Sequence, residues 1–288
     1  MSTLPPARFR FALIGAGRVG TAVSVLLQQA GHEPIGVVSR SNASASAAAE
    51  RLNSRVSSMD DLASADVYLI GTGLDALSEV AGSIPEVDGK TVIHFAGAAG
   101  VEPLSGVVDR GGLACALHPV QACPTVDIAI ARLPGSAWGV TCTPEAVEWA
   151  DQLIADEFRG FPVAVAESDR SLWHVAAVVT SNGIAALVAA GELMLEEIGI
   201  AEPERVLGPI AVGTAENVRD GGGGARMLTG PIVRGEVATI ERHIESLQDR
   251  PHDLADLYRL ISALVLLIAR RTGRIEATDA ERITEALR

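Results

Sequence analysis

The feature that most constrains the fold is the stretch Phe11–Gly20, which reads FALIGAGRVG. An apolar run is followed there by three glycines with the spacing GxGxxG, namely Gly15, Gly17 and Gly20. Valine and leucine then recur at helical spacing up to Gly31, and a second strand-like run begins at Pro34. The pattern therefore predicts a strand, a glycine-rich turn, a helix and a second strand.

The context of the glycines predicts a dinucleotide site. A lone GxGxxG is weak evidence, but this one follows a strand and opens a helix within a unit of about 30 residues. Gly15 suits the tight turn, Gly17 a close approach to a pyrophosphate, and Gly20 close packing of helix on strand. The positive end of the helix would then face the phosphates. The alternative is a glycine-rich turn in an empty α/β sheet. We expect further cofactor contacts from four residues: Ala16, Arg18, Val19 and Thr72.

The residues after the second strand indicate which cofactor binds. An NAD site usually has an acidic residue about 20 positions beyond the glycines. This chain has Ser39, Arg40 and Ser41 there. A guanidinium matches a 2′-phosphate in charge and geometry, so NADP(H) is favoured. The alternative is that Arg40 is a solvated loop residue.

The order of elements predicts two domains. Seven strands are expected, at Arg8–Ile14, Pro34–Ser39, Asp66–Ile70, Thr91–Phe95, Leu113–Leu117, Ala137–Cys142 and Phe161–Val165. Helices alternate with them, which is typical of a doubly wound, mainly parallel α/β sheet. Five long helices follow, at Glu167–Ile198, Pro203–Arg219, Glu236–Gln248, Leu254–Arg271 and Asp279–Leu287. We therefore expect a cofactor-binding domain at 1–165 and an all-helical domain at 166–288.

Composition excludes several classes of partner. The formal net charge of −13 argues against nucleic acid and anionic membranes, which require a basic face. Three cysteines without CxxC spacing suggest neither a disulfide framework nor a zinc site. The N-terminus does not resemble a secretory signal, so a cytoplasmic location is expected. Two very apolar stretches, Val175–Gly191 and Leu260–Ile268, are interpreted as buried helices rather than membrane spans.

Three stretches carry a resemblance to a known group of proteins. They are ALHPVQACP at 116–124, LWHVAAVVTSNGIAAL at 172–187 and LTGPIVRGEVATIERH at 228–243. Together they resemble bacterial Rossmann-like oxidoreductases with an all-helical C-terminal domain of unknown function, some of which serve as alternative ketopantoate reductases. The chain is more distantly similar to ketopantoate reductase, pyrroline-5-carboxylate reductase and the 6-phosphogluconate dehydrogenase superfamily. The resemblance implies an N-terminal Rossmann domain, and it leaves the substrate open.

The chain departs from these relatives at the catalytic position. Many of them have a lysine on the first long helix of the second domain, with an asparagine one turn on. The single lysine here, Lys90, opens a strand and should lie at the wrong edge of the sheet. The helix instead carries His174, Ser181 and Asn182, which share a broad polar face. We predict His174 as the proton donor, Asn182 as a substrate anchor and Ser181 as an alternative; equally, His174 could be a hydrogen-bonded core or interface residue.

Other polar residues are weaker candidates. His94 and His118 end apolar strands and could face the same cleft, with His118 near the nicotinamide. Their spacing does not suggest zinc, and we predict no metal. Arg234 could bind a substrate carboxylate and Glu236 could orient it, although RGE could equally start a helix.

The sequence thus favours an NADPH-dependent reductase of a small 2-oxo acid or related carbonyl, with ketopantoate as a candidate substrate. The alternative is an NADP(H)-binding regulatory or scaffold protein without chemistry. The apolar helix at 172–191 and the resemblance also predict a homodimer that pairs through the second domains.

Overall fold

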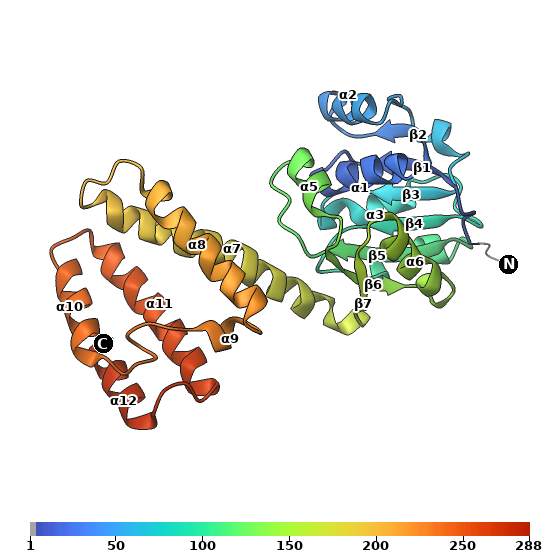
Figure 1. Ribbon diagram of the computed structural model, residues 1–288. Helices are drawn as coiled ribbons and strands as arrows, with labels where there is room; N and C mark the ends of the chain where they lie inside the picture. Colours follow the sequence, from blue (N-terminus) through green and yellow to red (C-terminus); the bar gives the residue numbers. More distant parts are fainter. Residues whose placement is uncertain (1–3) are drawn as a thin grey trace. The chain divides into compact units, whose positions relative to one another are not determined.

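The glycine-rich stretch opens the first of two compact units, Met1–Val179 and Thr180–Arg288 (Figure 1). The computed structural model describes residues 4–288, so the first three residues of the expected domain 1–165 lie outside it. The division lies beyond the expected boundary, within helix α7 (Arg170–Glu196). It does so because the first turns of this helix pack with the first unit.

Within the described residues, the first unit holds a seven-stranded sheet of order β2-β1-β3-β4-β5-β6-β7. The strands are β1 (Arg10–Ile14), β2 (Glu33–Val38), β3 (Val67–Ile70), β4 (Thr91–His94), β5 (Leu113–Pro119), β6 (Ala137–Cys142) and β7 (Phe161–Ala164). Neighbours are parallel except for β5 and β6. The predicted strands and the doubly wound, mainly parallel sheet are confirmed.

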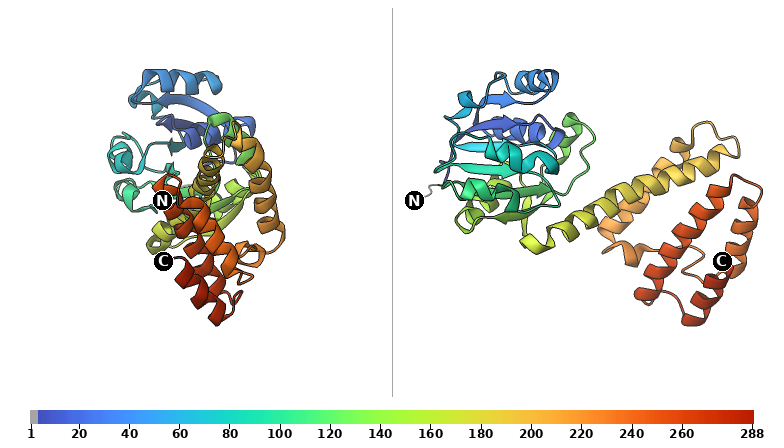
Figure 2. Two further views of the ribbon diagram at one scale, coloured as in Figure 1. Left: turned by 90° about the vertical axis from the view of Figure 1, so that its left-hand side faces the viewer. Right: turned by 180° about the vertical axis from the view of Figure 1, so that it is seen from behind.

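Helices cover both faces of this sheet (Figures 1 and 2). One core is formed with α1 (Arg18–Gln29), α2 (Asn42–Arg51), α5 (Val126–Arg132) and α6 (Val147–Glu157). The other is formed with α3 (Leu77–Gly82), α4 (Ser105–Val108) and short 3₁₀ turns, of which η1 is Asp60–Leu62 and η3 is Glu102–Leu104. Two turns at the carboxyl edge, η2 (Leu74–Ala76) and η5 (Glu167–Asp169), lie near the site, and η4 (Pro144–Ala146) precedes α6.

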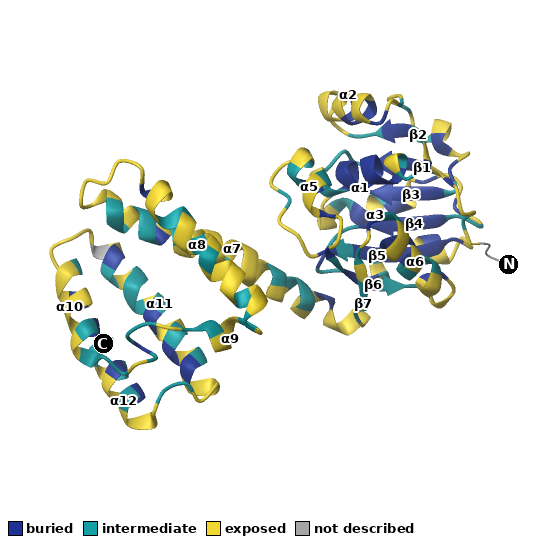
Figure 3. Ribbon diagram, viewed as in Figure 1, coloured by how far each residue is buried: buried dark blue, intermediate teal, exposed yellow. Residues whose placement is uncertain are grey.

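The central strands are continuous apolar runs because helices cover both of their faces. All four residues of β3 are buried, as are all four of β4, which ends in His94. The dark blue strands in Figure 3 show this burial. A rigid parallel sheet therefore supports every loop at its carboxyl edge.

The second unit consists of helices. Besides the C-terminal part of α7 it contains α8 (Pro203–Asp220), α9 (Gly224–Met227), α10 (Val237–Leu247), α11 (His252–Arg271) and α12 (Ala277–Ala286). Its core is small and centres on Ile240, Ile244, Leu266 and Ile283, from three helices. The predicted all-helical C-terminal domain is confirmed.

The apolar stretches Val175–Gly191 and Leu260–Ile268 were expected to be buried helices. This expectation is wrong for the single chain, because both helices expose large apolar side chains. On α7, Val179 is 66% exposed, and on α11, Leu260 is 70% exposed. The error arose because apolar composition shows that a face avoids water but does not show which element covers it. By length and composition alone, residues Glu167–Glu196 would also suffice to cross a membrane.

Candidate active site

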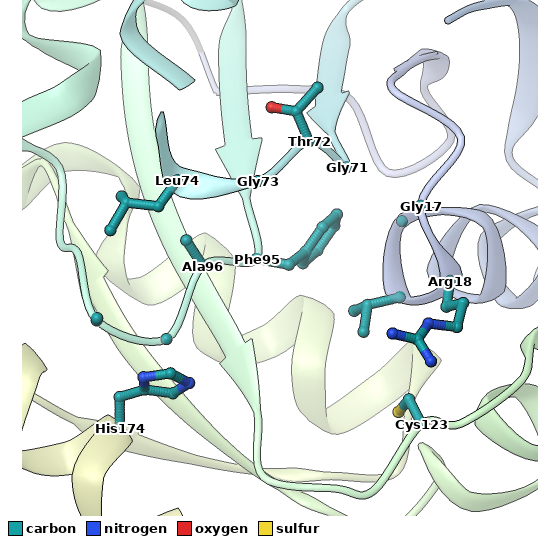
Figure 4. Close-up of a pocket in the computed structure, with 14 residues that line it drawn as sticks. Gly17, Arg18, Gly71, Thr72, Gly73, Leu74, Phe95, Ala96, Cys123 and His174 are labelled. Carbon is teal, nitrogen blue, oxygen red and sulfur yellow. The ribbon is translucent and has the colours of Figure 1, made fainter. Parts of the chain in front are cut away.

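A pocket of about 400 Å³ lies at the carboxyl edge of the sheet in the first unit (Figure 4). It is lined by Gly17–Gly20 at the start of α1, by Gly71–Leu74 after β3, by Phe95–Ala98 after β4, and by Cys123 and His174. Strand β1 lies between β2 and β3 in the sheet. The chain passes from β1 to β2 on one side and then crosses to β3 on the other side, which makes the carboxyl end of β1 a topological switch point. Ligands of open α/β sheets bind at such switch points, outside the carboxyl ends of the strands.

The glycine-rich turn packs directly on the residues after β3. Gly15 has φ of +85°, a left-handed conformation that favours glycine. A methyl group on Gly20 would lie 2.9 Å from the Cα atom of Gly71, which confirms the predicted close packing of helix on strand. A side chain on Gly17 would overlap the carbonyl oxygen of Gly71, so internal packing alone requires glycine here; its predicted role in admitting a pyrophosphate stays a prediction.

The start of α1 presents free donors to the pocket. The first amide with a hydrogen bond into the helix is that of Thr21, which donates to the Gly17 carbonyl at 2.9 Å. Within the described residues the amides of Arg18, Val19 and Gly20 have no acceptor. The Thr72 hydroxyl on the opposite wall is buried without a hydrogen-bond partner. These donors and the helix dipole suit an anionic ligand such as a pyrophosphate.

The predicted 2′-phosphate residues lie just after β2. Arg40 is exposed, and its guanidinium has no ion-pair partner within the part of the chain that the structure describes. Ser39 is half-buried, and Ser41 is the N-cap of α2, where its hydroxyl accepts from the Ser44 amide at 3.3 Å. Arg40 is therefore a free cation beside a helix N-terminus, as a 2′-phosphate site requires.

The loop after β4 is held from two sides. Arg170 on α7 is 1% exposed, and its guanidinium donates to the carbonyls of Ala96, Ala99 and Gly139 at 2.9, 2.9 and 3.1 Å. From the sheet, the His94 ring accepts from the Ala96 amide and donates from Nε2 to the Gly100 carbonyl at 2.7 Å. His94 thus lies beneath the loop as a structural tie and does not face the pocket as expected.

Glu167 fixes the far end of the same loop. Its carboxylate accepts from the amides of Val101 at 2.8 Å and Glu102 at 3.3 Å. A side chain on Gly100 would overlap that carboxylate. The loop that walls the pocket is therefore tied to both the sheet and the start of α7, and it is rigid in advance of any ligand.

The structure brings together two of the predicted catalytic residues. His174 lines the pocket (Figure 4), and the ring of His118 lies 5.5 Å from it, centroid to centroid, at an interplanar angle of 85°. A side chain on Gly97 would overlap both rings, so both ring edges face this glycine. The Trp173 indole N–H donates to His118 Nδ1 at 3.1 Å.

Burial sets the charge of two of these histidines. It lowers the pKa of His118 to about 4, helped by the positive Arg170 guanidinium and by His174 and His94. It also lowers the pKa of His94 to about 4, against the opposing effect of the hydrogen bond to Gly100. Both imidazoles are therefore neutral at pH 7. Near the other wall, burial raises the pKa of the Cys123 thiol, which keeps it protonated.

The other four predicted catalytic residues belong to the second unit. Ser181 and Asn182 are exposed on α7 in the second unit. Arg234 and Glu236 form an ion pair with each other, and Glu236 is the residue before α10, as the helix-start interpretation requires. Lys90 lies before β4 at the amino edge of the sheet, where its Nζ donates to the Ala63 and Ala65 carbonyls at 3.0 and 2.6 Å. Substrate roles for Ser181, Asn182, Arg234 and Glu236 stay predictions.

Sequence reasoning missed Gly71, Trp173, Arg170 and Glu167. An arginine that opens an apolar helix is a signal in hindsight, because charge at a buried position must be hydrogen-bonded. Gly71, directly after a buried strand, gave no comparable signal. Among residues 4–288, no group of three or more His, Cys, Asp or Glu side chains could hold a metal ion.

Comparison with known protein families gives two matches, one in each half of the chain. The family model of a Rossmann-like domain matches residues 1–119, and that of a domain of unknown function, DUF2520, matches residues 136–265. The Rossmann-like match covers β1 to β5, and the DUF2520 match runs from β6 and β7 into the helical second unit. No curated protein matches the chain significantly in sequence.

Solved structures with the same fold include several reductases. A protein from Bacteroides fragilis described as an NADP oxidoreductase has a TM-score of 0.71 at 23% identity, over 90% of this chain and 98% of its own. A reductive aminase from Aspergillus terreus, solved with NADPH and ethyl-5-oxohexanoate, has a TM-score of 0.67 at 16% identity, over 97% and 99%. A pyrroline-5-carboxylate reductase from Coxiella burnetii has a TM-score of 0.57 at 15% identity, over 93% and 98%. At these identities the similarity establishes the fold.

Proposed function

We propose that this protein is an NADPH-dependent reductase that delivers hydride to the carbon of a C=O or C=N bond in a small molecule. The observation that carries the proposal is one pocket that joins the free amides at the start of α1 to the imidazole of His174. The similar folds of an NADP oxidoreductase and of an NADPH-bound reductive aminase support it.

The residues present fit NADP(H). The amides of Arg18, Val19 and Gly20 would hold the pyrophosphate, with the Thr72 hydroxyl as a further donor and the unpaired Arg40 on the 2′-phosphate. When bound, the nicotinamide supplies the hydride. The protein must then supply a proton or hydrogen bond to the oxygen or nitrogen that gains negative charge.

In this proposal His174 provides that proton. Its ring lies at the end of the pocket away from Arg18, beside the rigid loop Phe95–Ala98 (Figure 4). An imidazole at this position can donate a proton to a developing alkoxide or amide anion. Lys90 does not have this role in the proposal, because it lies at the opposite edge of the sheet and donates to backbone carbonyls there.

For the substrate we propose a small 2-oxo acid or related carbonyl, with ketopantoate as the first candidate, in a cytoplasmic enzyme. A cyclic imine such as pyrroline-5-carboxylate is the second candidate, because a protein of similar fold is a reductase of that compound. The two classes differ in whether the acceptor atom is oxygen or nitrogen, and the pocket has donors for either.

One experiment tests cofactor and class together. Thermal stabilisation by NADPH and NADH is compared first, and NADPH oxidation at 340 nm is then followed with ketopantoate, other 2-oxo acids and pyrroline-5-carboxylate. Turnover with one substrate class supports the reductase. Binding of NADPH without oxidation by any compound would instead support the alternative, a regulatory or scaffold protein that binds NADP(H).

A further inference from the structure

The side chain of His118 is held in one tautomer by a residue that does not itself reach the pocket. The Trp173 indole can only donate, and its N–H lies 3.1 Å from His118 Nδ1. Nδ1 must therefore be the unprotonated, accepting nitrogen. In a neutral imidazole the proton then resides on Nε2.

His118 Nε2 lies directly behind Gly97, a residue that lines the pocket. The missing side chain of Gly97 leaves room for the edges of both imidazoles. Within the described residues Nε2 has no hydrogen-bond partner. The atom is not fully shielded from solvent. A fixed N–H group without an acceptor therefore lies 5.5 Å, ring to ring, from the His174 side chain of the pocket.

The surroundings favour the neutral ring. The charged and titratable groups that act on His118 are Arg170, His174 and His94, and none of them is an anion. Arg170 is itself buried and satisfied by three carbonyls, so it remains a fixed positive charge near the ring. The carboxylate of Glu167 is committed to the amides of Val101 and Glu102.

The position of Trp173 is built into the sheet. It lies on α7 three residues after Arg170, and its indole packs on Gly139, where an added side chain would come within 2.6 Å of the indole nitrogen. Gly139 is the register partner of His118 across β5 and β6. The absence of a side chain at Gly139 thus creates the space from which Trp173 reaches His118.

We propose that Trp173 is a positioning residue that fixes His118 as a neutral Nε2–H donor aimed at the acceptor atom of the substrate, while His174 supplies the proton. This deepens the proposed function and rests on it. A neutral N–H that cannot ionise near pH 7 stabilises developing negative charge without competing with His174 for the proton. The two histidines therefore have different tasks at one site.

The test is side-chain ¹⁵N NMR of the full-length protein, which contains six histidines. The His118 signals are assigned by their loss in His118→Gln. At pH 7 we expect the neutral Nε2–H pattern, retained until the pH approaches 4. In Trp173→Phe the ring is kept and the donor is lost, so an Nδ1–H population should appear. Trp149→Phe, a tryptophan that packs against Phe9, is the matched control and should change nothing.

Activity is measured separately. If a substrate is found, Trp173→Phe should lower kcat by about tenfold or less, as expected for one hydrogen bond, with the KM for NADPH unchanged. If neither the wild type nor any variant turns over a substrate, the proposed reductase function is wrong, and the NMR test of the His118 tautomer remains valid. An Nδ1–H or charged His118 at pH 7, or an unaltered tautomer in Trp173→Phe, would overturn the positioning role. If Trp173→Phe does not fold, the wild-type tautomer and titration still decide.

Discussion

The imidazole rings of His118 and His174 are perpendicular, with centroids 5.5 Å apart, and both edges face Gly97. His118 lies on a strand and His174 on a helix that starts 52 residues after His118, so the local sequence around either residue does not show that they meet. The rigid loop between them is tied by Arg170 and His94. In the proposed function the two rings would act as a preorganised pair of donors.

Replacing Gly97 with alanine tests whether this close approach matters. The added methyl group would overlap both rings, so at least one imidazole must move. We expect turnover to fall at least tenfold with little change in NADPH affinity, since a displacement of about 1 Å at a reacting group can cost 10²-fold. Gly82→Ala is the control, because a methyl group there meets open space. Equal activity of the two variants would contradict the prediction.

Replacing His174 tests the proton donor directly. His174→Asn should lower turnover by the 10²–10⁴ typical of a general acid, with NADPH affinity nearly intact. Lys90→Ala should affect neither, because Lys90 binds carbonyls at the opposite edge of the sheet. Stopped-flow NADPH oxidation and NADPH binding by fluorescence measure the two quantities. If His118→Asn abolishes activity and His174→Asn does not, the proton donor is His118.

Replacing Arg40 tests the choice of cofactor. Its exposed guanidinium has no ion-pair partner within residues 4–288, so Arg40→Ala should leave the fold unchanged. A charged hydrogen bond to the 2′-phosphate contributes about 1.5–3 kcal/mol, so NADPH affinity should fall about ten- to hundredfold while NADH affinity stays the same. Arg242→Ala, an exposed arginine of the second unit, serves as the control. Equal thermal shifts with NADPH and NADH in the wild type would remove the basis for this assignment.

The sequence predicted the sheet well and the site in part. The seven strands were predictable because buried parallel strands are apolar runs bounded by turns, and the glycine-rich turn was predictable because Gly15 and Gly20 obey a local rule. Gly71 and Gly139 were not, because they are required by contacts with Gly15 and Trp173 across the fold. Ser41 was predictable as an N-cap because serine before a helix accepts from the first free amides, and it caps α2; its role at the cofactor stays a prediction.

Stability should depend on pH through the buried His94. The unfolded chain binds its proton near pH 6.5 and the folded chain near pH 4, so the unfolded state binds more protons between these values. Stability that is present above pH 6.5 is therefore lost as the pH falls toward 4. His94 alone should contribute roughly 2 kcal/mol to the loss between pH 7 and pH 5, and His118 adds to it.

The measurement is urea unfolding followed by tryptophan fluorescence. It reports the first unit alone, because the three tryptophans, Trp138, Trp149 and Trp173, all lie there. In His94→Gln the difference in stability between pH 7 and pH 5 should shrink, whatever the variant does to stability at either pH alone. An unchanged difference would show that His94 is not the group that titrates.

The last prediction is the homodimer of about 60 kDa, twice the chain mass of 29.9 kDa. The second unit buries few apolar residues and exposes many. On α11, Leu260, Leu264 and Leu267 recur at helical spacing and are 51–70% exposed, and on α8, Ile210 is 65% exposed. Exposed apolar faces of this kind mark interaction surfaces, and a second copy of the chain is the partner proposed for them.

We therefore expect light scattering of the wild type at micromolar concentration, without detergent, to give the dimer mass. The double variant Leu264→Glu and Ile210→Glu should shift it toward the monomer, because two carboxylates per chain would be buried in the contact. Glu241→Lys, an exposed charge change on α10, is the control and should leave the mass unchanged. A monomeric wild type under these conditions would refute the dimer. A wild type that stays insoluble until detergent is added would also contradict the dimer. It would favour contact of the long apolar helix α7 with a membrane instead.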